Sequence, residues 1–316
     1  MNLWTILCIA LAAALMFFLV LPAFVIFFAV FSRKKPVPFE DYDQKKYKNH
    51  YYMPYLGRIG EARDSLRRRR AERVCALSYD GLRLCGEYYS QGACRTAILF
   101  HGIGAELYTN LSSQARFLFQ NGFNVLLVCH RAHAPSQGRF TTIGLREQYD
   151  VLSWVDWAEE HGAREILLYG VSMGGASVAF ASDKLGGTKV KAIVSDSGFY
   201  SVYEQMKRDA KKLHIPGWMV PVQRVLARAF LRVDLKDNTA ESLSKSAVPV
   251  FFLHGTDDET VEYRWSEKNY AACSAPKQLL LVEGAPHTLS LLTDETAVGN
   301  ALAAFINTYF TKQGDF

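Results

Sequence analysis

Ser172 is the residue whose type and setting point most clearly to covalent chemistry. It stands in Gly170-Val-Ser172-Met-Gly174, directly after the apolar residues 166–169. That run is typical of a buried parallel strand, and the small residues after the motif suit a helix packed close to the sheet. A serine on such a strand-to-helix turn has a strained backbone, and the glycines give the neighbouring chain room to approach. We expect Ser172 to be a nucleophile above a helix N-terminus, whose amides favour developing negative charge.

A serine needs a base and an acid, and both types follow later apolar runs. Residues 248–253 lead to Asp257, Asp258 and Glu259, and residues 277–282 lead to His287. A neutral imidazole can take the proton of a serine, and a carboxylate fixes its tautomer and stabilises its charged form. The order serine, acid, histidine is the one expected when the strand-to-helix turn carries the serine. The sequence therefore predicts a triad for acyl transfer, with the acid left open among the three carboxylates.

The remaining polar residues at the strand ends fit supporting roles. His101-Gly102-Ile103-Gly104 follows the apolar residues 96–100, where backbone amides of Ile103 and Met173 are expected to stabilise a tetrahedral oxyanion. We interpret His101, His254 and Asp196 as residues that stabilise turns. The histidines lie on separate loops without a carboxylate set, and no glycine-rich phosphate loop is present. We expect neither a metal nor another cofactor.

Apolar runs that alternate with helical stretches must position these residues. Asp80-Gly81 between residues 74–77 and 82–88 predicts an initial hairpin. The pattern after it predicts an α/β fold with a doubly wound, mostly parallel sheet, in which ligands bind at the carboxyl ends of the strands. The expected later strands cover residues 96–100, 124–128, 166–169, 190–194, 248–253 and 277–282, and the main helices cover 112–120, 145–161, 174–184 and 295–310.

The amino-terminal stretch predicts a membrane anchor. Residues 3–31 contain no charged residue and no histidine. As a helix they would extend about 43 Å, against about 30 Å for the hydrocarbon core of a bilayer, and tilt or a bend at Pro22 would absorb the excess. A cleaved signal peptide, the competing interpretation, would need a basic start and a shorter apolar core. We expect residues 1–32 to form one transmembrane helix in the cell membrane.

A basic segment follows this stretch. Residues 33–73 hold thirteen lysines and arginines and six acidic residues, beginning with Arg33-Lys34-Lys35. Positive charge on this flank alone predicts that the bulk of the chain is cytoplasmic. We assign residues 33–73 to a connector that contacts anionic headgroups, with a short helix over 59–73. For the run 67–70, a helix face exposed to water is the equal alternative. The remainder is slightly acidic, which argues against a nucleic-acid partner, and six cysteines without paired spacing fit reduced thiols.

Four motifs together resemble the α/β-hydrolase superfamily over about residues 74–310, most closely the bacterial membrane-anchored serine hydrolases. They are His101-Gly102, Gly170-Val-Ser-Met-Gly174, His254-Gly-x-x-Asp258-x-x-Val261 and Gly284-Ala-Pro-His287. The resemblance implies Ser172 as nucleophile, Asp258 as acid and His287 as base. Members often carry Asp-x-Arg-Gly-x-Gly-x-Ser after the fourth strand, whereas this chain has Cys129-His-Arg-Ala-His-Ala-Pro-Ser136.

Residues 74–316 would then form the hydrolase domain, with a small helical cap inserted at about 199–247. Two helices are expected in the cap, over 202–213 and 220–231. Apolar residues of the cap could roof a pocket, namely Met206, Trp218, Met219, Val225, Phe230 and Leu231. The resemblance implies a serine hydrolase that cleaves a carboxylic ester, either a small molecule or a lipid-like compound, through an acyl-enzyme. Thioesters, amides and peptides pass through the same intermediate, and a non-catalytic binding domain at the membrane is the alternative of a different class.

Overall fold

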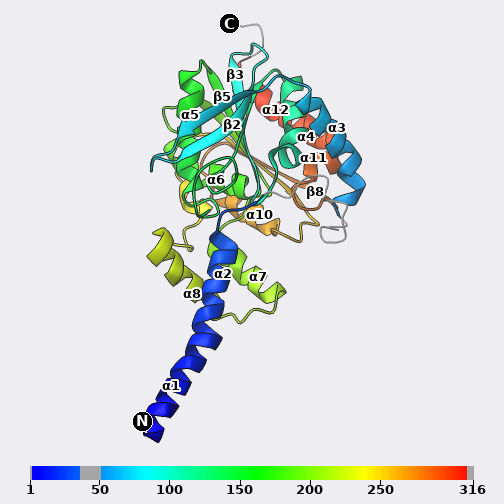
Figure 1. The fold of residues 1–316 in the computed structure, drawn as a ribbon. Coiled ribbons are helices and arrows are strands. Elements are labelled where there is room, and N and C mark those ends of the chain that lie inside the picture. Colours follow the sequence, from blue (N-terminus) through cyan, green and yellow to red (C-terminus); the bar gives the residue numbers. More distant parts are fainter. Residues whose placement is uncertain (1, 36–50, 312–316) are drawn as a thin grey trace.

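Eight strands form one sheet at the centre of the molecule (Figure 1). The computed structural model describes residues 2–35 and 51–311. The strand order is β1-β2-β4-β3-β5-β6-β7-β8; the pairs β1–β2 and β2–β4 are antiparallel and the others parallel. This confirms the predicted fold class. The strands are β1 (Glu72–Leu77), β2 (Arg83–Tyr89), β3 (Arg95–Phe100), β4 (Asn124–Val128), β5 (Glu165–Val171), β6 (Val190–Asp196), β7 (Val250–Gly255) and β8 (Lys277–Val282).

Two apolar cores lie on the two faces of the sheet. Successive side chains of a strand point to opposite faces, so Ile98 and Phe100 of β3 join one core and Ala97 and Leu99 join the other. One face is covered by α5 (Glu147–Glu160), α6 (Met173–Ala181), α9 (Thr239–Leu243) and α10 (Arg264–Ala272). The other is covered by α4 (Leu107–Gln120), α11 (Ser290–Thr293) and α12 (Glu295–Tyr309). The sequence did not predict the short helices α9, α10 and α11.

The amino-terminal helix leaves the domain from the edge where the parallel strands end. It consists of α1 (Leu3–Leu15), a π-helical turn (Met16–Val20) and α2 (Leu21–Phe31), and only α2 reaches the domain (Figure 1). Beside α2 lie the cap helices α7 (Val202–Lys212) and α8 (Met219–Leu226), the latter continued by a π-helical turn (Ala227–Leu231). A third apolar core holds Phe27 and Phe31 of α2 together with Phe199, Ala227 and Leu231.

The connector proves partly folded onto the domain. A helix occupies Leu56–Arg67 (α3), where residues 59–73 were expected, and Ile59, Ala62 and Leu66 on one of its faces are buried. It packs on α4, and β1 begins at Glu72, within the segment assigned to the connector. The three- and four-residue spacing of the apolar side chains accounts for this docking. The part of the basic segment over residues 36–50 lies outside the described residues.

Candidate active site

Ser172 occupies the turn between β5 and α6 with a strained backbone. Its φ of 55° and ψ of −115° are unusual for a residue with a side chain. Two glycines make the turn possible: a Cβ on Gly170 would lie 2.2 Å from the Gly174 carbonyl oxygen, and one on Gly174 would lie 2.1 Å from the Phe100 carbonyl oxygen. The sharp turn raises the serine hydroxyl above the sheet at the start of α6.

His287 and Asp258 complete a chain of hydrogen bonds to Ser172. His287 follows β8, and its Nε2 lies 2.9 Å from Ser172 Oγ. Its Nδ1 lies 2.6 Å from Asp258 Oδ2, in the turn after β7. All three side chains are at most one-tenth exposed. Because a carboxylate only accepts, Nδ1 carries the proton and donates it, which leaves Nε2 free to accept the serine proton.

Only one of the three candidate acids reaches the histidine. Asp258 is buried, whereas Asp257 and Glu259 are exposed. The second carboxylate oxygen of Asp258 accepts from the amides of Thr260 and Val261, at 2.8 and 2.7 Å. Burial raises the pKa of Asp258, but the electrostatic interaction with His287 and hydrogen bonds from His254 and His287 outweigh it, so the pKa lies well below its usual range. The carboxyl therefore stays ionised.

His254 contacts the same carboxylate, which sequence reasoning did not foresee. Its Nε2 lies 3.1 Å from Asp258 Oδ2 and 3.0 Å from the carbonyl oxygen of Val261. Both atoms are acceptors, so Nε2 carries the proton, and Nδ1 accepts from the Ser266 hydroxyl at 2.7 Å. His254 was interpreted as a residue that stabilises a turn; here it also fixes the carboxylate that orients His287. The four-residue spacing from His254 to Asp258 was the available signal.

The loop after β3 lies against the serine. A Cβ on Gly102 would lie 3.3 Å from Ser172 Cβ. The amide of Gly102 donates to Asn110 Oδ1 at 2.8 Å, and the amide of Gly104 donates to His133 Nε2 at 2.9 Å. These bonds fix the loop on both sides of Ile103, which lines one cavity together with Ser172 and Met173. The structure thus brings both residues expected to stabilise an oxyanion to the serine.

Three buried imidazoles support this loop from behind. His101 Nδ1 lies 2.6 Å from the Gly102 carbonyl oxygen, and His101 Nε2 accepts from the amide of His130 at 3.2 Å. The rings of His130 and His133 lie 4.8 and 4.9 Å from that of His101. Burial lowers the pKa of His130 to about 3 and the pKa of His101 well below its ordinary value. The cluster is therefore neutral and structural, in agreement with the interpretation of His101.

Asp196 lies beside the triad without joining it. Its carboxylate accepts from Tyr169 Oη at 3.2 Å and Ser197 Oγ at 3.0 Å, and its backbone oxygen accepts the Ser172 amide at 2.8 Å. Burial raises the pKa of Asp196 to about 6, although neighbouring hydrogen bonds oppose this. The contacts place Asp196 in the support of the serine turn.

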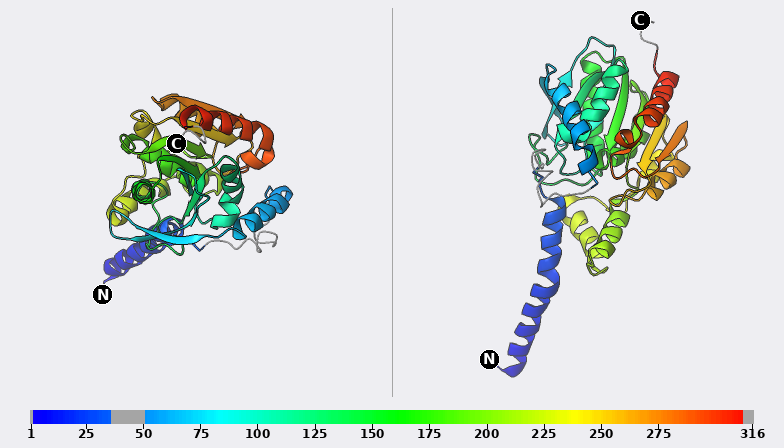
Figure 2. Two further views of the ribbon diagram at one scale, coloured as in Figure 1. Left: turned by 90° about the horizontal axis from the view of Figure 1, so that it is seen from above. Right: turned by 90° about the vertical axis from the view of Figure 1, so that its right-hand side faces the viewer.

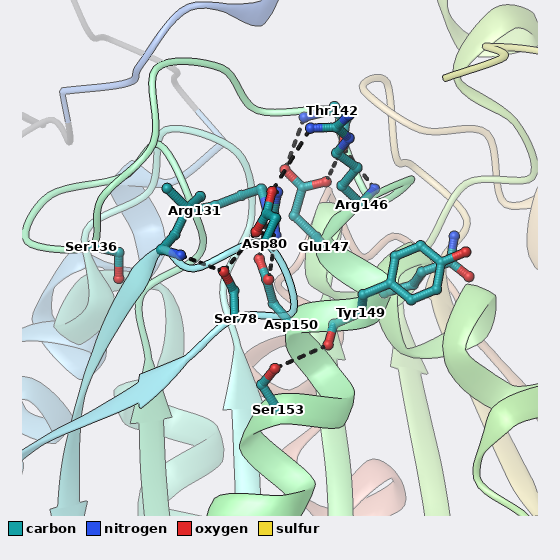
Figure 3. A network of polar contacts seen from close by, with 12 residues as sticks. Ser78, Asp80, Arg131, Ser136, Thr142, Arg146, Glu147, Tyr149, Asp150 and Ser153 are labelled. Carbon is teal, nitrogen blue, oxygen red and sulfur yellow. Dashed lines mark hydrogen bonds and ion pairs between the residues drawn. The ribbon is translucent and has the colours of Figure 1, made fainter. Parts of the chain in front are cut away.

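The loop after β4 keeps the arginine of the family pattern as buried Arg131, although it lacks the aspartate and both glycines of that pattern (Figure 3). Arg131 Nε and Nη2 donate to Asp150 at 2.7 and 2.6 Å, and Nη1 donates to Asp80 at 2.9 Å. Burial lowers the pKa of Arg131, but Asp150 and Asp80 outweigh it and raise the pKa above its ordinary value. The arginine joins the β1–β2 hairpin to α5 and so fixes the loop that holds His130 and His133.

Glu147, the first residue of α5, shapes one wall of the site (Figure 3). Its carboxylate accepts from Thr141 Oγ1 at 2.8 Å, from the Thr142 amide and hydroxyl at 2.9 and 2.6 Å, and from the Gly144 amide at 2.9 Å. These bonds hold Ile143 with a φ of 55° in the lining of the cavity. Sequence reasoning missed the Arg131 network, because its partners come from distant elements. It also missed Glu147 and Ile143, although the partners of Glu147 lie within six residues of it.

The cavity in front of Ser172 has a volume of about 330 Å³. Its walls are mostly apolar, and they include Met206 and Met219 from the cap, as the sequence suggested, but also Ile26 and Val30 from α2. Trp218, Val225 and Phe230 of the cap, in contrast, are exposed. A second, more polar hollow of about 300 Å³ lies on the other side of His287, lined by Tyr51, Asp257 and Glu259 among others. Within residues 2–35 and 51–311, no group of three histidine, cysteine or acidic residues is placed to hold a metal.

Comparison with known proteins finds two matching family models. Residues 91–246 match the family model Hydrolase_4, described as serine aminopeptidase, S33, and residues 223–315 match Abhydrolase_4, described as TAP-like protein. The uncharacterized protein YqkD of Bacillus subtilis is 24% identical over 219 residues, which cover 67% of this chain and 71% of that protein. The uncharacterized protein YfhR of Escherichia coli is 24% identical over 224 residues, covering 69% and 73%.

A solved structure shares the fold. The esterase Pf2001 of Pyrococcus furiosus superposes with a TM-score of 0.62 at 22% identity, over 77% of this chain and 92% of that one. The two family models together extend from residue 91, just before β3, to beyond α12, and so include the strands β3 to β8 that carry the site. The chain belongs to the α/β-hydrolase superfamily.

Proposed function

We propose that the protein is a serine hydrolase that cleaves a carboxylic ester through an acyl-enzyme. The proposal rests on one observation: a continuous hydrogen-bond chain from Ser172 Oγ through His287 to buried Asp258, at the floor of an apolar cavity. Asp258 is held ionised, and the hydrogen bonds place His287 Nε2 at the serine hydroxyl. The strained serine turn and the fixed loop at Ile103 support the same activity.

The steps follow from the hydrogen bonds. Ser172 Oγ attacks the ester carbonyl carbon while its proton passes to His287 Nε2. Amides of Ile103 and Met173 would bind the oxyanion, and each such donor is worth about 3–4 kcal/mol of transition-state stabilisation. His287 then gives the proton to the departing alcohol oxygen as the carbon–oxygen bond breaks. A water molecule, deprotonated by His287, attacks the acyl-enzyme and releases the acid and Ser172.

The apolar cavity favours an ester over a peptide. A peptide needs hydrogen-bond partners for its backbone along the bound strand, whereas the walls beyond Ser172 offer mainly aliphatic and aromatic side chains. Thioesters and simple amides remain alternatives with the same chemistry, and the description of one matching family as aminopeptidases keeps amide cleavage among the outcomes to test. The alternative of another class is a domain that binds an apolar ligand without turning it over.

We further propose that the helix Leu3–Phe31 spans the cell membrane and that the domain is cytoplasmic. Its 29 residues are long and apolar enough to cross a bilayer. Packing supports a retained helix over a cleaved signal peptide, since Phe27 and Phe31 are fully buried against the domain and removal would uncover the third core. Protease added to intact cells should leave residues 33–316 uncut and should cleave them after lysis; digestion in intact cells would reverse the orientation.

A fluorophosphonate probe on the purified full chain tests the activity. We expect covalent labelling of the wild type and none of Ser172→Ala, together with loss of p-nitrophenyl ester hydrolysis. Ser153→Ala is the matched control, because Ser153 lies on α5 away from the cavity and bonds only the Tyr149 carbonyl oxygen (Figure 3). A folded wild-type protein that neither labels nor hydrolyses esters, thioesters or amides would leave the binding domain as the function.

A further inference from the structure

The cavity at Ser172 is built partly from the helix that projects from the domain. Ser172, Met173 and Ile103 line its catalytic end, and Ile26 and Val30 of α2 line another part of the same space. Between them stand apolar residues of the cap such as Met206 and Met219. A helix proposed to cross the membrane is thus also a wall of the site, so the cavity must lie beside the bilayer.

The length of the projecting helix places this wall at the membrane boundary. A span needs about 20 residues to cross the hydrocarbon core, and Leu3–Phe31 has 29. The excess of about nine residues matches the part that the protein covers: Ala23, Phe27 and Phe31 are buried, whereas the large apolar side chains described from Leu3 to Phe18 are exposed. Ile26 and Val30 therefore lie where hydrocarbon gives way to headgroups.

The outer face of the cap extends the apolar surface of α2. Leu213, Trp218, Val225 and Phe230 are 43–66% exposed. The cap helices lie on the same side of the domain as the projecting helix (Figure 2). The ring of Phe230 lies 5.9 and 5.7 Å from those of Phe24 and Phe27. Exposed apolar side chains gathered beside a membrane helix mark a surface in contact with lipid.

The helix and the cap are joined firmly enough to form one wall. Gln223 Nε2 of α8 donates to the Ala23 carbonyl oxygen at 2.9 Å, in a buried position. At the other end of α2, the Thr141 amide donates to the Phe31 oxygen, and the Lys34 amide donates to the Ala132 oxygen, both at 2.8 Å. The span is thereby tied both to the cap and to the loop that carries Ile143.

We propose that this cavity receives the acyl chain of an ester resident in the membrane, which enters from the bilayer beside α2 and the cap. The inference rests on the proposed serine hydrolase activity and names its substrate class. The ester carbonyl lies at Ser172 and the chain extends along Ile26, Val30 and the cap methionines. The alcohol part faces His287, which protonates it, and the polar hollow on that side. The apolar walls select a hydrocarbon chain, and the exposed apolar side chains of α2 and the cap supply the contact with the layer that holds it.

Chain-length selectivity of α2 variants tests the wall. The full chain is reconstituted in diether phosphatidylcholine vesicles, which contain no ester bond, and p-nitrophenyl palmitate is compared with p-nitrophenyl acetate. We expect Ile26→Trp to lower the palmitate-to-acetate ratio of kcat/KM by about 50-fold, the loss for excluding roughly three methylene groups from apolar surroundings. The control Val25→Trp changes an exposed neighbour on the same helix that does not line the cavity, and it should keep the wild-type ratio.

Two outcomes would overturn the proposal. The first is an unchanged palmitate-to-acetate ratio in Ile26→Trp, which would show that α2 does not line the acyl site. If that variant does not fold, Val30→Phe, which fills less of the cavity, provides the same test. The route is tested by loading the palmitate ester either into the vesicles that hold the enzyme or into separate vesicles. Entrance from the bilayer predicts hydrolysis confined to the shared vesicles; equal rates would mean delivery through water. Fluorophosphonate labelling of the wild type shows whether the protein is a serine hydrolase at all, so either result can be distinguished from failure of the proposed function.

Discussion

The two sides of Ser172 are built in different ways. On the histidine side, each side chain comes from a short turn directly after a strand, and buried hydrogen bonds of 2.6–3.1 Å fix it. On the cavity side, the walls come from α2, the loop before α5 and the cap, held together largely by apolar contact. The histidine side has one precise geometry, whereas the cavity side offers a shape and a surface.

The difference separates what decides the reaction from what decides the substrate. Hydrogen-bonded groups must sit within tenths of an ångström for proton transfer, and a short strand-end turn can hold them so. An acyl chain needs only apolar volume, so its site can be assembled from elements far apart in the sequence. We therefore expect substitutions on the histidine side to change turnover sharply and substitutions on the cavity side to change selectivity.

The largest effect is expected at the catalytic acid. Asp258→Asn preserves shape but favours the wrong imidazole tautomer of His287, and turnover should fall by about 10⁴. Asp257→Asn, an exposed neighbour in the same turn, should change turnover by less than about tenfold, because Asp257 does not contact His287. Steady-state rates with an ester substrate decide between them. Comparable losses in both variants would contradict the assignment of a single acid.

The sequence was sufficient for the histidine side because its spacing is local. Ser172, Asp258 and His287 each follow an apolar run by a few residues, and parallel strands bring those ends to one edge. The mostly parallel sheet followed from the alternation of strands and helices, and the antiparallel start followed from the hairpin signal at Asp80-Gly81; the strand order came only from the structure. The choice among Asp257, Asp258 and Glu259 came from resemblance, and the structure supplies the physical reason: only Asp258 points inward.

The walls of the cavity could not be predicted from the sequence in the same way. Nothing in the pattern of residues 3–31 says that Ile26 and Val30 would face the serine some 140 residues later. The spacing of apolar residues in the cap predicts two helices, but it does not say which side chains face the cavity and which face outward. Long-range packing decides both, and a uniformly apolar helix has no periodic signal to reveal its covered face.

The next largest effect is expected at Arg131, because the loop that holds His130 and His133 depends on its buried ion pair with Asp150. Arg131→Met leaves Asp150 buried without its cation, and unfolding should become easier by about 3–5 kcal/mol. Arg224 of the cap makes a similar forked contact with Asp234, at 2.6 and 2.7 Å, but its side chain is 27% exposed. Arg224→Met should cost clearly less. Urea unfolding of both variants provides the measurement, and equal losses would contradict the contrast.

Lowering the pH should reduce the unfolding free energy of the protein through protonation of His130 in the unfolded state. Burial holds its pKa at about 3, while in the unfolded chain it is about 6.5. Between these values the unfolded state binds the extra proton, so stability falls as pH falls. From pH 7 to 5 His130 should account for about 2 kcal/mol of the lost unfolding free energy, and His130→Phe should lose that much less. His214→Phe, an exposed site in the cap, should retain the wild-type pH dependence; an identical dependence in His130→Phe would contradict the assignment.

The smallest effect is expected at His254. It tests whether His254 positions Asp258 through a hydrogen bond or only fills space. His254→Leu removes the Nε2 donor to Asp258, and kcat/KM should fall by about tenfold, the low end for a lost hydrogen bond to a charged group. Without that donor the carboxylate of Asp258 stabilises a protonated His287 more strongly, so the acid limb of the pH–rate profile should also move to higher pH. His254→Gln keeps an N–H near the same place and should recover most of the rate. If Leu and Gln variants lose activity equally and their pH profiles match that of the wild type, His254 only fills space, and Asp258 is positioned by the amides of Thr260 and Val261 alone.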